Sequence, residues 1–145
     1  MHWSSTSLAV LLAAAMLPFC IARAAQSEEA DLKEEIVLRC HYEMGEFGVE
    51  VVQHCVETEN AALQAISAYP EQAKAIVSRC TQNTRGSGWE MVKVCVDGDI
   101  EADAALAQYP VKHASVIQLC RTELGKQGPA TVKACVDQRI SAEHK

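Results

Sequence analysis

The sequence is 145 residues long, which suits one domain, and its formal net charge is −6. The acidic balance argues against partners that are polyanions, so we expect no binding to nucleic acid or to an anionic membrane surface. Aromatic residues make up only 5% of the chain, so a large aromatic core is excluded as the main source of stability.

The first predicted element is a signal peptide over residues 1–24. Residues 8–17 read LAVLLAAAML, an apolar run too short to span a membrane but suited to the core of a Sec-type signal peptide. Ala22-Arg23-Ala24 follows as an A-x-A cleavage pattern. We expect cleavage after Ala24, which leaves residues 25–145 as a single helical-repeat domain. Loss of Arg23 changes the net charge from −6 to −7.

Six of the seven cysteines recur along this domain with a period of forty residues. A fixed period in this range is typical of stacked supersecondary units, and we place the repeats at about 30–70, 71–110 and 111–145. The seventh cysteine, Cys20, leaves with the leader, and the even number that remains indicates a disulfide framework in an exported protein. The recurring cysteines are Cys40, Cys55, Cys80, Cys95, Cys120 and Cys135.

Each repeat predicts two helices. The first carries apolar residues at helical spacing and ends where the aligned glycines Gly48, Gly88 and Gly128 break the pattern. The second is longer, and Pro70 and Pro110 stop it. We therefore predict an all-α fold of three tandem, disulfide-stapled αα-hairpins that form a short α-solenoid.

The positions of the cysteines predict which sulfurs are joined. Cys40 lies five residues before Gly45, and Cys55 lies seven residues after Gly48. Both are thus roughly 7 to 11 Å from the turn on facing helices, within reach of a disulfide. The alternative is a zinc site, which usually has ligand cysteines two to four residues apart. We predict the pairs Cys40–Cys55, Cys80–Cys95 and Cys120–Cys135.

One position on the second helix of each repeat is polar although it lies on the apolar stripe. At 100° per residue, Glu59 falls between Cys55 and Leu63. The same position holds Asp99 in the second repeat and Arg139 in the third. An acid on an apolar stripe needs a partner, because burial of an unpaired charge is costly.

The residue before the first cysteine of each repeat offers such a partner. It is Arg39 or Arg79 where the second helix has an acid, and Leu119 where it has none. A ligand-reading role for the acids is the alternative. We predict the ion pairs Arg39–Glu59 and Arg79–Asp99, with Arg139 reaching an acid of the preceding repeat. Three further recurring acids are interpreted as a solvated face: Glu57, Asp97 and Asp137.

No catalytic arrangement is recognisable. The chain has no G-x-S-x-G, no C-x-x-C and no glycine-rich phosphate loop after a predicted strand. We expect no enzymatic activity, no cofactor and no metal. The one metal alternative left open is the pair His41 and His54, which flanks the first two cysteines.

Trp89 follows Gly88 at the start of a second helix, where the other repeats have Val49 and Pro129. It has two interpretations. It covers the end of its hairpin, or it is an exposed contact for a partner protein, since tryptophan is enriched among binding hot spots.

The segments C-x-x-x-M-G-E-F-G at 40–48 and M-V-K-V-C-V-D at 91–97 resemble those of small exported proteins of Gram-negative bacteria, mostly uncharacterised, that are built from cysteine-paired helical repeats. The resemblance implies an all-helical exported protein and carries no catalytic residues. It departs at Thr84 to Gly88 and at Pro129. More loosely, the layout is similar to tetratricopeptide-like solenoids, whose usual work is protein binding.

We expect a non-enzymatic binding or adaptor module in the periplasm or outside the cell, with no membrane association after signal cleavage. The acidic charge suits a basic protein or peptide partner. The alternatives are a stress chaperone that is activated by acid, and a small-ligand-binding protein or weak hydrolase with its site in a groove between repeats. The sequence leaves the partner and the oligomeric state open.

Overall fold

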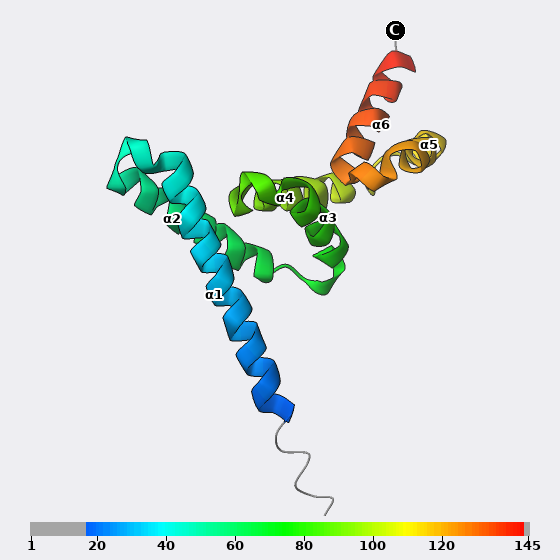
Figure 1. The fold of residues 1–145 in the computed structure, drawn as a ribbon. Helices are drawn as coiled ribbons and strands as arrows, with labels where there is room; N and C mark the ends of the chain where they lie inside the picture. The colour runs from blue at the N-terminus through cyan, green and yellow to red at the C-terminus, as the bar shows by residue number, and fades with distance from the viewer. Residues whose placement is uncertain (1–16, 144–145) are drawn as a thin grey trace, which may run out of the picture.

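The computed structural model describes the backbone of residues 17–143 and the side chains of residues 29–142. Figure 1 shows a chain of α-helices, with no strand among the described residues. The predicted all-α fold class is confirmed. The helices are α1 (Leu17–Met44), α2 (Val49–Ser67), α3 (Lys74–Thr84), α4 (Trp89–Leu106), α5 (Ala114–Leu124) and α6 (Pro129–Glu143).

A short 3-10 turn joins the two helices of each hairpin. Each turn ends on one of the aligned glycines, and these glycines have φ values of 101°, 105° and 109°. A side chain would be strained at such φ values, so glycine is required for the chain to reverse here. The turns and their glycines are η1 (Gly45–Phe47) with Gly48, η3 (Arg85–Ser87) with Gly88, and η5 (Gly125–Gln127) with Gly128.

One disulfide links the two helices of every hairpin. The Cα–Cα distances are 5.8 Å for Cys40–Cys55, 5.7 Å for Cys80–Cys95 and 6.0 Å for Cys120–Cys135. The first cysteine of each pair is fully buried. The predicted pairing is confirmed, and each bond closes a loop with a sequence separation of 15 residues.

Proline marks each connection between hairpins. Pro70 precedes η2 (Glu71–Ala73), which continues into α3, and Pro110 precedes η4 (Val111–His113), which continues into α5. Each proline carbonyl accepts a hydrogen bond of 2.9 Å from a backbone N–H three residues on. The prolines therefore end one hairpin, as predicted, and stand directly before the first turn of the next.

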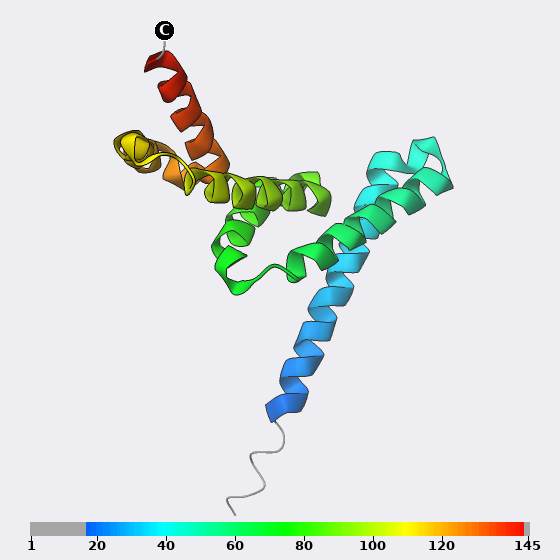
Figure 2. The same cartoon turned by 180° about the vertical axis from the view of Figure 1, so that it is seen from behind.

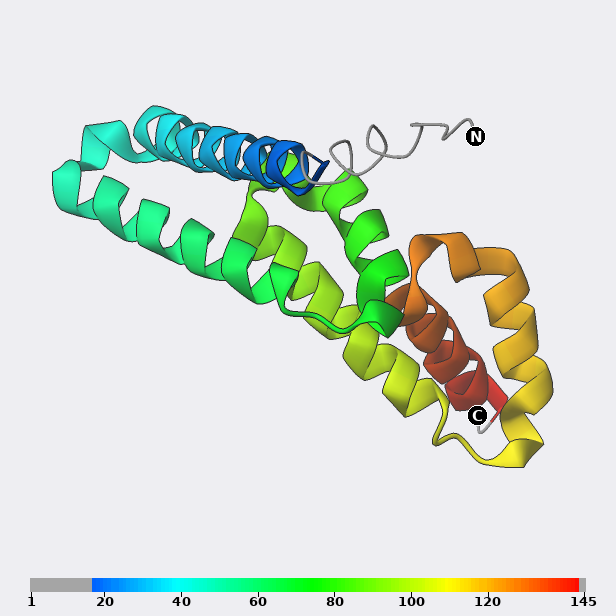
Figure 3. The ribbon, with the colours of Figure 1, turned by 90° about the horizontal axis from the view of Figure 1, so that it is seen from below.

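The hairpins stack through their second helices. α2 contacts α4, and α4 contacts α6, so these three helices follow one another through the molecule (Figure 3). Val52, Val92 and Val132 occupy equivalent repeat positions and are all buried along this path. One core cluster spans the first two hairpins, and a smaller one joins the end of α4 to the third hairpin.

The helix α1 is much longer than its counterparts, with 28 residues against 11 in α3 and in α5. Its N-terminal part projects away from the other helices (Figures 1 and 2). It begins at Leu17 and runs through the predicted cleavage point after Ala24. Residues 1–16, the rest of the predicted leader, lie outside the described residues, so the cleavage stays a prediction. Between residues 17 and 143, none of the helices has both the length and the apolarity that crossing a membrane requires.

Candidate interaction sites

Both predicted arginine–acid pairs form inside their hairpins. Arg39 Nη2 lies 2.5 Å from Glu59 Oε2, but off the line of a hydrogen bond, so this contact is an ion pair. Arg79 likewise contacts Asp99. The acids are almost completely buried, with 6% of Glu59 and 3% of Asp99 exposed. Each buried acid thus lies against a guanidinium from the facing helix, which offsets the cost of its burial.

The same two acids also bind the next hairpin. Glu59 accepts a hydrogen bond of 2.5 Å from the backbone N–H of Trp89, the first residue of α4. Asp99 accepts one of 3.0 Å from the backbone N–H of Ala130 at the start of α6. A carboxylate at a helix N-terminus satisfies a free N–H and interacts favourably with the helix dipole. The acid of one hairpin therefore caps the second helix of the following hairpin.

The turn glycines allow this close approach. A Cβ on Gly88 would lie 2.4 Å from Arg39 Nη1 and 2.5 Å from Glu59 Oε1, and a Cβ on Gly128 would lie 2.5 Å from the Arg79 guanidinium carbon. Arg79 adds a hydrogen bond of 2.9 Å to the carbonyl of Gln127. The arginine–acid pairs are thus parts of the interface between hairpins, and their charges are already paired there.

The prediction for Arg139 is wrong. Its guanidinium lies 2.7 Å from Glu123, an acid of its own hairpin. Asp99, the acid of the preceding hairpin, is already paired with Arg79 and binds the start of α6. Arg139 is nine residues further along α6, roughly 14 Å away at the helical rise, so it cannot share that acid.

A second contact between hairpins was missed from the sequence. Tyr69 donates a hydrogen bond to Asp97, and Tyr109 donates one to Asp137, both across 28 residues. The aspartates, interpreted above as a solvated face, are therefore tyrosine-binding groups. A tyrosine before proline, recurring 28 residues ahead of an aspartate, is the signal that could have revealed them.

These contacts shift the pKa values of the groups involved. Burial, followed by the hydrogen bond to Asp97, raises the pKa of Tyr69 to about 12. The hydrogen bonds from Lys93 and Tyr69 lower the pKa of Asp97, and those from Lys133 and Tyr109 lower that of Asp137. The protonated tyrosine and the ionised aspartate thus stabilise each other.

Trp89 is not an exposed partner contact, so that interpretation is wrong. Only 7% of the residue is exposed, and it belongs to the core cluster shared by the first two hairpins. The guanidinium of Arg85 lies 5.0 Å from the centre of its ring. Trp89 covers the hairpin end because the preceding hairpin packs against it, which the sequence of one repeat does not show.

Among residues 29–142, one group of three potential metal ligands lies close together: Cys80, Cys95 and Asp99. The two sulfurs are joined in a disulfide and the carboxylate contacts Arg79, so no thiolate is available to bind a metal. His41 and His54 are both exposed and belong to no such group within this range.

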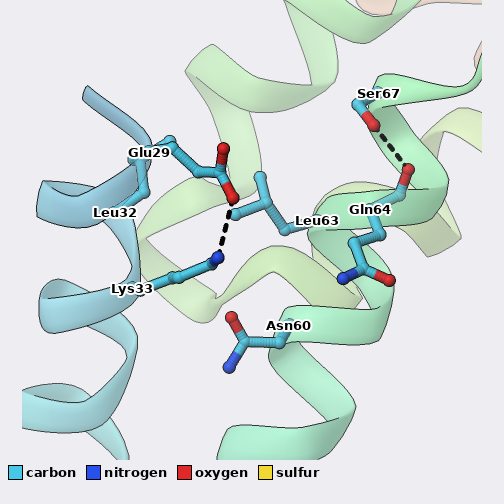
Figure 4. A pocket seen from close by; sticks show the side chains of 7 residues that line it. All are labelled: Glu29, Leu32, Lys33, Asn60, Leu63, Gln64 and Ser67. Carbon is cyan, nitrogen blue, oxygen red and sulfur yellow. Dashed lines mark hydrogen bonds and ion pairs between the residues drawn. The ribbon is translucent and has the colours of Figure 1, made fainter. Parts of the chain in front are cut away.

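A groove of about 360 Å³ lies between α1 and α2. Figure 4 shows Glu29 and Lys33 on α1 across from Asn60 and Leu63 on α2. Glu29 and Lys33 pair with each other at 2.7 Å, and this contact lowers the pKa of Glu29. Asn60 donates to the backbone of its own helix. These three polar groups are thus engaged within the chain, and Gln64 and Ser67 complete the polar lining of the groove.

A further groove of about 340 Å³ lies between the first and second hairpins, where a small-ligand site was considered. Its charged wall is the Arg39–Glu59 pair, and Ser87 and Glu90 line the opposite side. Arg39 and Glu59 are already paired with each other, and the other titratable residues that line this groove are Glu43, His54 and Glu90. Comparisons of the chain with protein-family models, curated proteins and solved structures find no match.

Proposed function

We propose that this chain is an exported helical-repeat protein that binds another protein or peptide without catalysis, in the periplasm or outside the cell. Three disulfides suit an oxidising compartment. They also hold each hairpin in one shape, which lowers the entropy lost when a partner binds.

The observation that carries this proposal is a set of large apolar side chains exposed on an array whose buried charges are already paired. Stacked hairpins present extended faces, and exposed apolar groups beyond those of an ordinary surface mark interaction sites. The side chains are Val37, Leu38, Tyr42, Phe47, Val49, Val51, Met91, Val94, Val111 and Leu119.

Site-specific photo-crosslinking in the native cell envelope tests this function. A photoreactive amino acid replaces Leu38 or Val94, and an exposed polar residue, Gln118, serves as the matched control position. We expect mass spectrometry to identify a discrete protein crosslinked at an apolar position and absent at Gln118. Crosslinks no stronger than background at every position would contradict the proposed function.

A second candidate, an acid-activated chaperone, is favoured by the contacts of Glu59 and Asp99. These carboxylates join one hairpin to the next, so their protonation would loosen the array while the disulfides keep each hairpin closed. We expect a variant with Glu59→Gln and Asp99→Asn to suppress client aggregation at neutral pH, and wild type to do so only in acid. The exposed Glu57→Gln is the control, and failure of wild type to suppress aggregation at any pH contradicts this candidate.

A further inference from the structure

The tip of the first hairpin exposes four large apolar side chains within ten residues. The exposed fractions are 91% for Tyr42, 62% for Phe47, 77% for Val49 and 41% for Val51. They lie at the end of α1, in η1 and in the first turn of α2. None contributes to the core clusters of the described residues. Packing of the core therefore does not explain why these four residues are apolar.

The other two hairpins show that the fold does not require apolar residues here. The turns are alike, and each ends on a glycine with a positive φ. At the four positions where hairpin one has exposed apolar side chains, hairpin two has two polar residues, the buried Trp89 and a half-exposed methionine. Hairpin three has three polar residues and a proline at these positions. The equivalents are Gln82, Ser87, Trp89 and Met91, then Thr122, Gln127, Pro129 and Thr131.

At the glycine and the start of the second helix, this surface is an interface in the two later hairpins, whereas the equivalents of Tyr42 and Phe47 are exposed there. Gly88 and Gly128 are buried beneath Arg39, Glu59 and Arg79 of the preceding hairpins, whereas Gly48 is exposed and has nothing near its Cβ position. No described residue of this chain covers the first tip in that way. The tip thus continues a stacking surface that is used twice elsewhere in the molecule.

The charge of the tip indicates what could cover it. Residues 41–51 contain three acids and no Lys or Arg, a net charge of −3 with histidine neutral. Residues 81–91 contain Arg85 and Glu90 and are neutral, and residues 121–131 carry +1. Exposed carboxylates among apolar groups favour a partner that places Lys or Arg beside apolar side chains. The acids are Glu46, Glu50 and Glu43, the last of which also lies 3.8 Å from Arg39 Nη1.

We propose that the first-hairpin tip, residues 42–51, is the docking surface for a basic segment of another protein in which aliphatic or aromatic side chains alternate with Lys or Arg. This inference rests on the proposed binding function and assigns its place and its partner class. A second copy of the chain is a poorer fit, because its basic tip at 121–131 has polar residues where apolar contacts are needed.

Three synthetic peptides of equal length test the docking surface on the full disulfide-bonded chain: one of Leu and Lys, one of Ser and Lys, and one of Leu and Glu. The readouts are calorimetry and the amide chemical shifts of the labelled protein. We expect the Leu/Lys peptide to shift residues 42–51 first. The Ser/Lys peptide should bind about tenfold or more weakly, and the Leu/Glu peptide should not bind.

The first matched variant exchanges two tip residues for those of the second hairpin, and the second removes two of the tip's charges. Tyr42→Gln with Phe47→Ser should weaken binding of the Leu/Lys peptide about tenfold or more, with an unchanged circular dichroism spectrum. Glu46→Gln with Glu50→Gln should weaken it and reduce its dependence on salt. The control Val111→Gln, at a residue 89% exposed on η4, should leave binding unchanged.

Binding that the tip variants leave intact, or shifts centred outside residues 42–51, overturns the docking surface. The chain alone could also associate as its concentration rises. If Tyr42→Gln with Phe47→Ser abolishes that association, the proposal of a basic partner is overturned, because the tip then binds a second copy of the chain. Crosslinking in the envelope separates the two proposals. If wild type and the tip variant capture the same partners equally, the protein still has the proposed binding function, but the binding site is not this tip.

Discussion

Glu59 and Asp99 act as N-caps for helices that cannot supply their own. The residue before α4 must be glycine because its φ is 105°, and glycine has no side chain to accept the free N–H groups. The carboxylate of the preceding hairpin takes that role at Trp89 and at Ala130. The turn requires glycine, and the N-cap that glycine cannot supply comes from the preceding repeat.

Replacement of Glu59 by Gln tests how much this contact contributes to the free energy of unfolding. The change leaves the mostly buried guanidinium of Arg39 with only the more distant carboxylate of Glu43, at 3.8 Å, as a counter-charge, so we expect the free energy of unfolding to fall by roughly 3 kcal/mol. Urea unfolding followed by the fluorescence of Trp89 measures it. The exposed Glu57→Gln should change stability by less than about 0.5 kcal/mol, and equal losses for both variants would refute the interpretation.

Gly48 and Gly88 form a matched pair for a second test. Both have φ near 100°, but only Gly88 has the ion pair within 3 Å of its Cβ position. Gly48→Ala should cost about 1–3 kcal/mol through backbone strain alone. Gly88→Ala should cost about 2 kcal/mol more, because Arg39 and Glu59 must move apart. Equal urea midpoints for the two variants would show that the close approach is unimportant.

Each interface between consecutive hairpins also has a tyrosine–aspartate contact, which should hold within a defined range of pH. The pKa of Asp97 is lowered from 3.8, so its contribution to stability is present above about pH 4 and is lost as the pH falls through the lower, folded value. The pKa of Tyr69 is raised from 10.0 to about 12, so its contribution is present below pH 10 and is lost as the pH rises towards 12. The contact should therefore hold between these limits.

Tyr69→Phe makes this range measurable. We expect the variant to lose about 1 kcal/mol of unfolding free energy at neutral pH, since one hydrogen bond to a half-exposed carboxylate is removed. The difference from wild type should shrink below pH 4 and above pH 10. Urea midpoints over this range measure it, and a constant difference would show that Asp97 and Tyr69 do not titrate as a pair.

The whole array is directional, because its two ends differ. Hairpins one and two each hold a buried arginine–acid pair that binds the next hairpin, whereas the third has Leu119 and Arg139 in those places. Arg139 instead pairs with Glu123 near the surface. The third hairpin thus carries no equivalent group for a further repeat, while the first leaves Gly48 uncovered.

The third hairpin should depend most on its disulfide. It has the smaller core cluster and, among its described residues, no buried ion pair of its own, so replacement of Cys120 and Cys135 by Ser should cost about 3 kcal/mol and open this hairpin first. Hydrogen exchange should show faster exchange in residues 114–142, with residues 49–67 unchanged. Uniform acceleration along the chain would mean that the three hairpins unfold as one unit.

Much of the fold was predictable because its signals are local. The period of forty residues, the spacing of Cys40 and Cys55, and the glycine at each turn depend on helix geometry within one hairpin. The Arg39–Glu59 pair was predictable for the same reason, since both residues lie at fixed heights on facing helices.

The sequence by itself determined the three disulfide-closed hairpins, because contacts within a hairpin follow from helical rise and turn length. Only the tertiary structure decided how consecutive hairpins meet: that Glu59 caps α4, that Tyr69 binds Asp97, that Trp89 is buried and that Arg139 stays within its own hairpin. Those contacts depend on the angle between hairpins. That angle is set by packing of side chains far apart in the sequence, and no periodicity within a repeat encodes it.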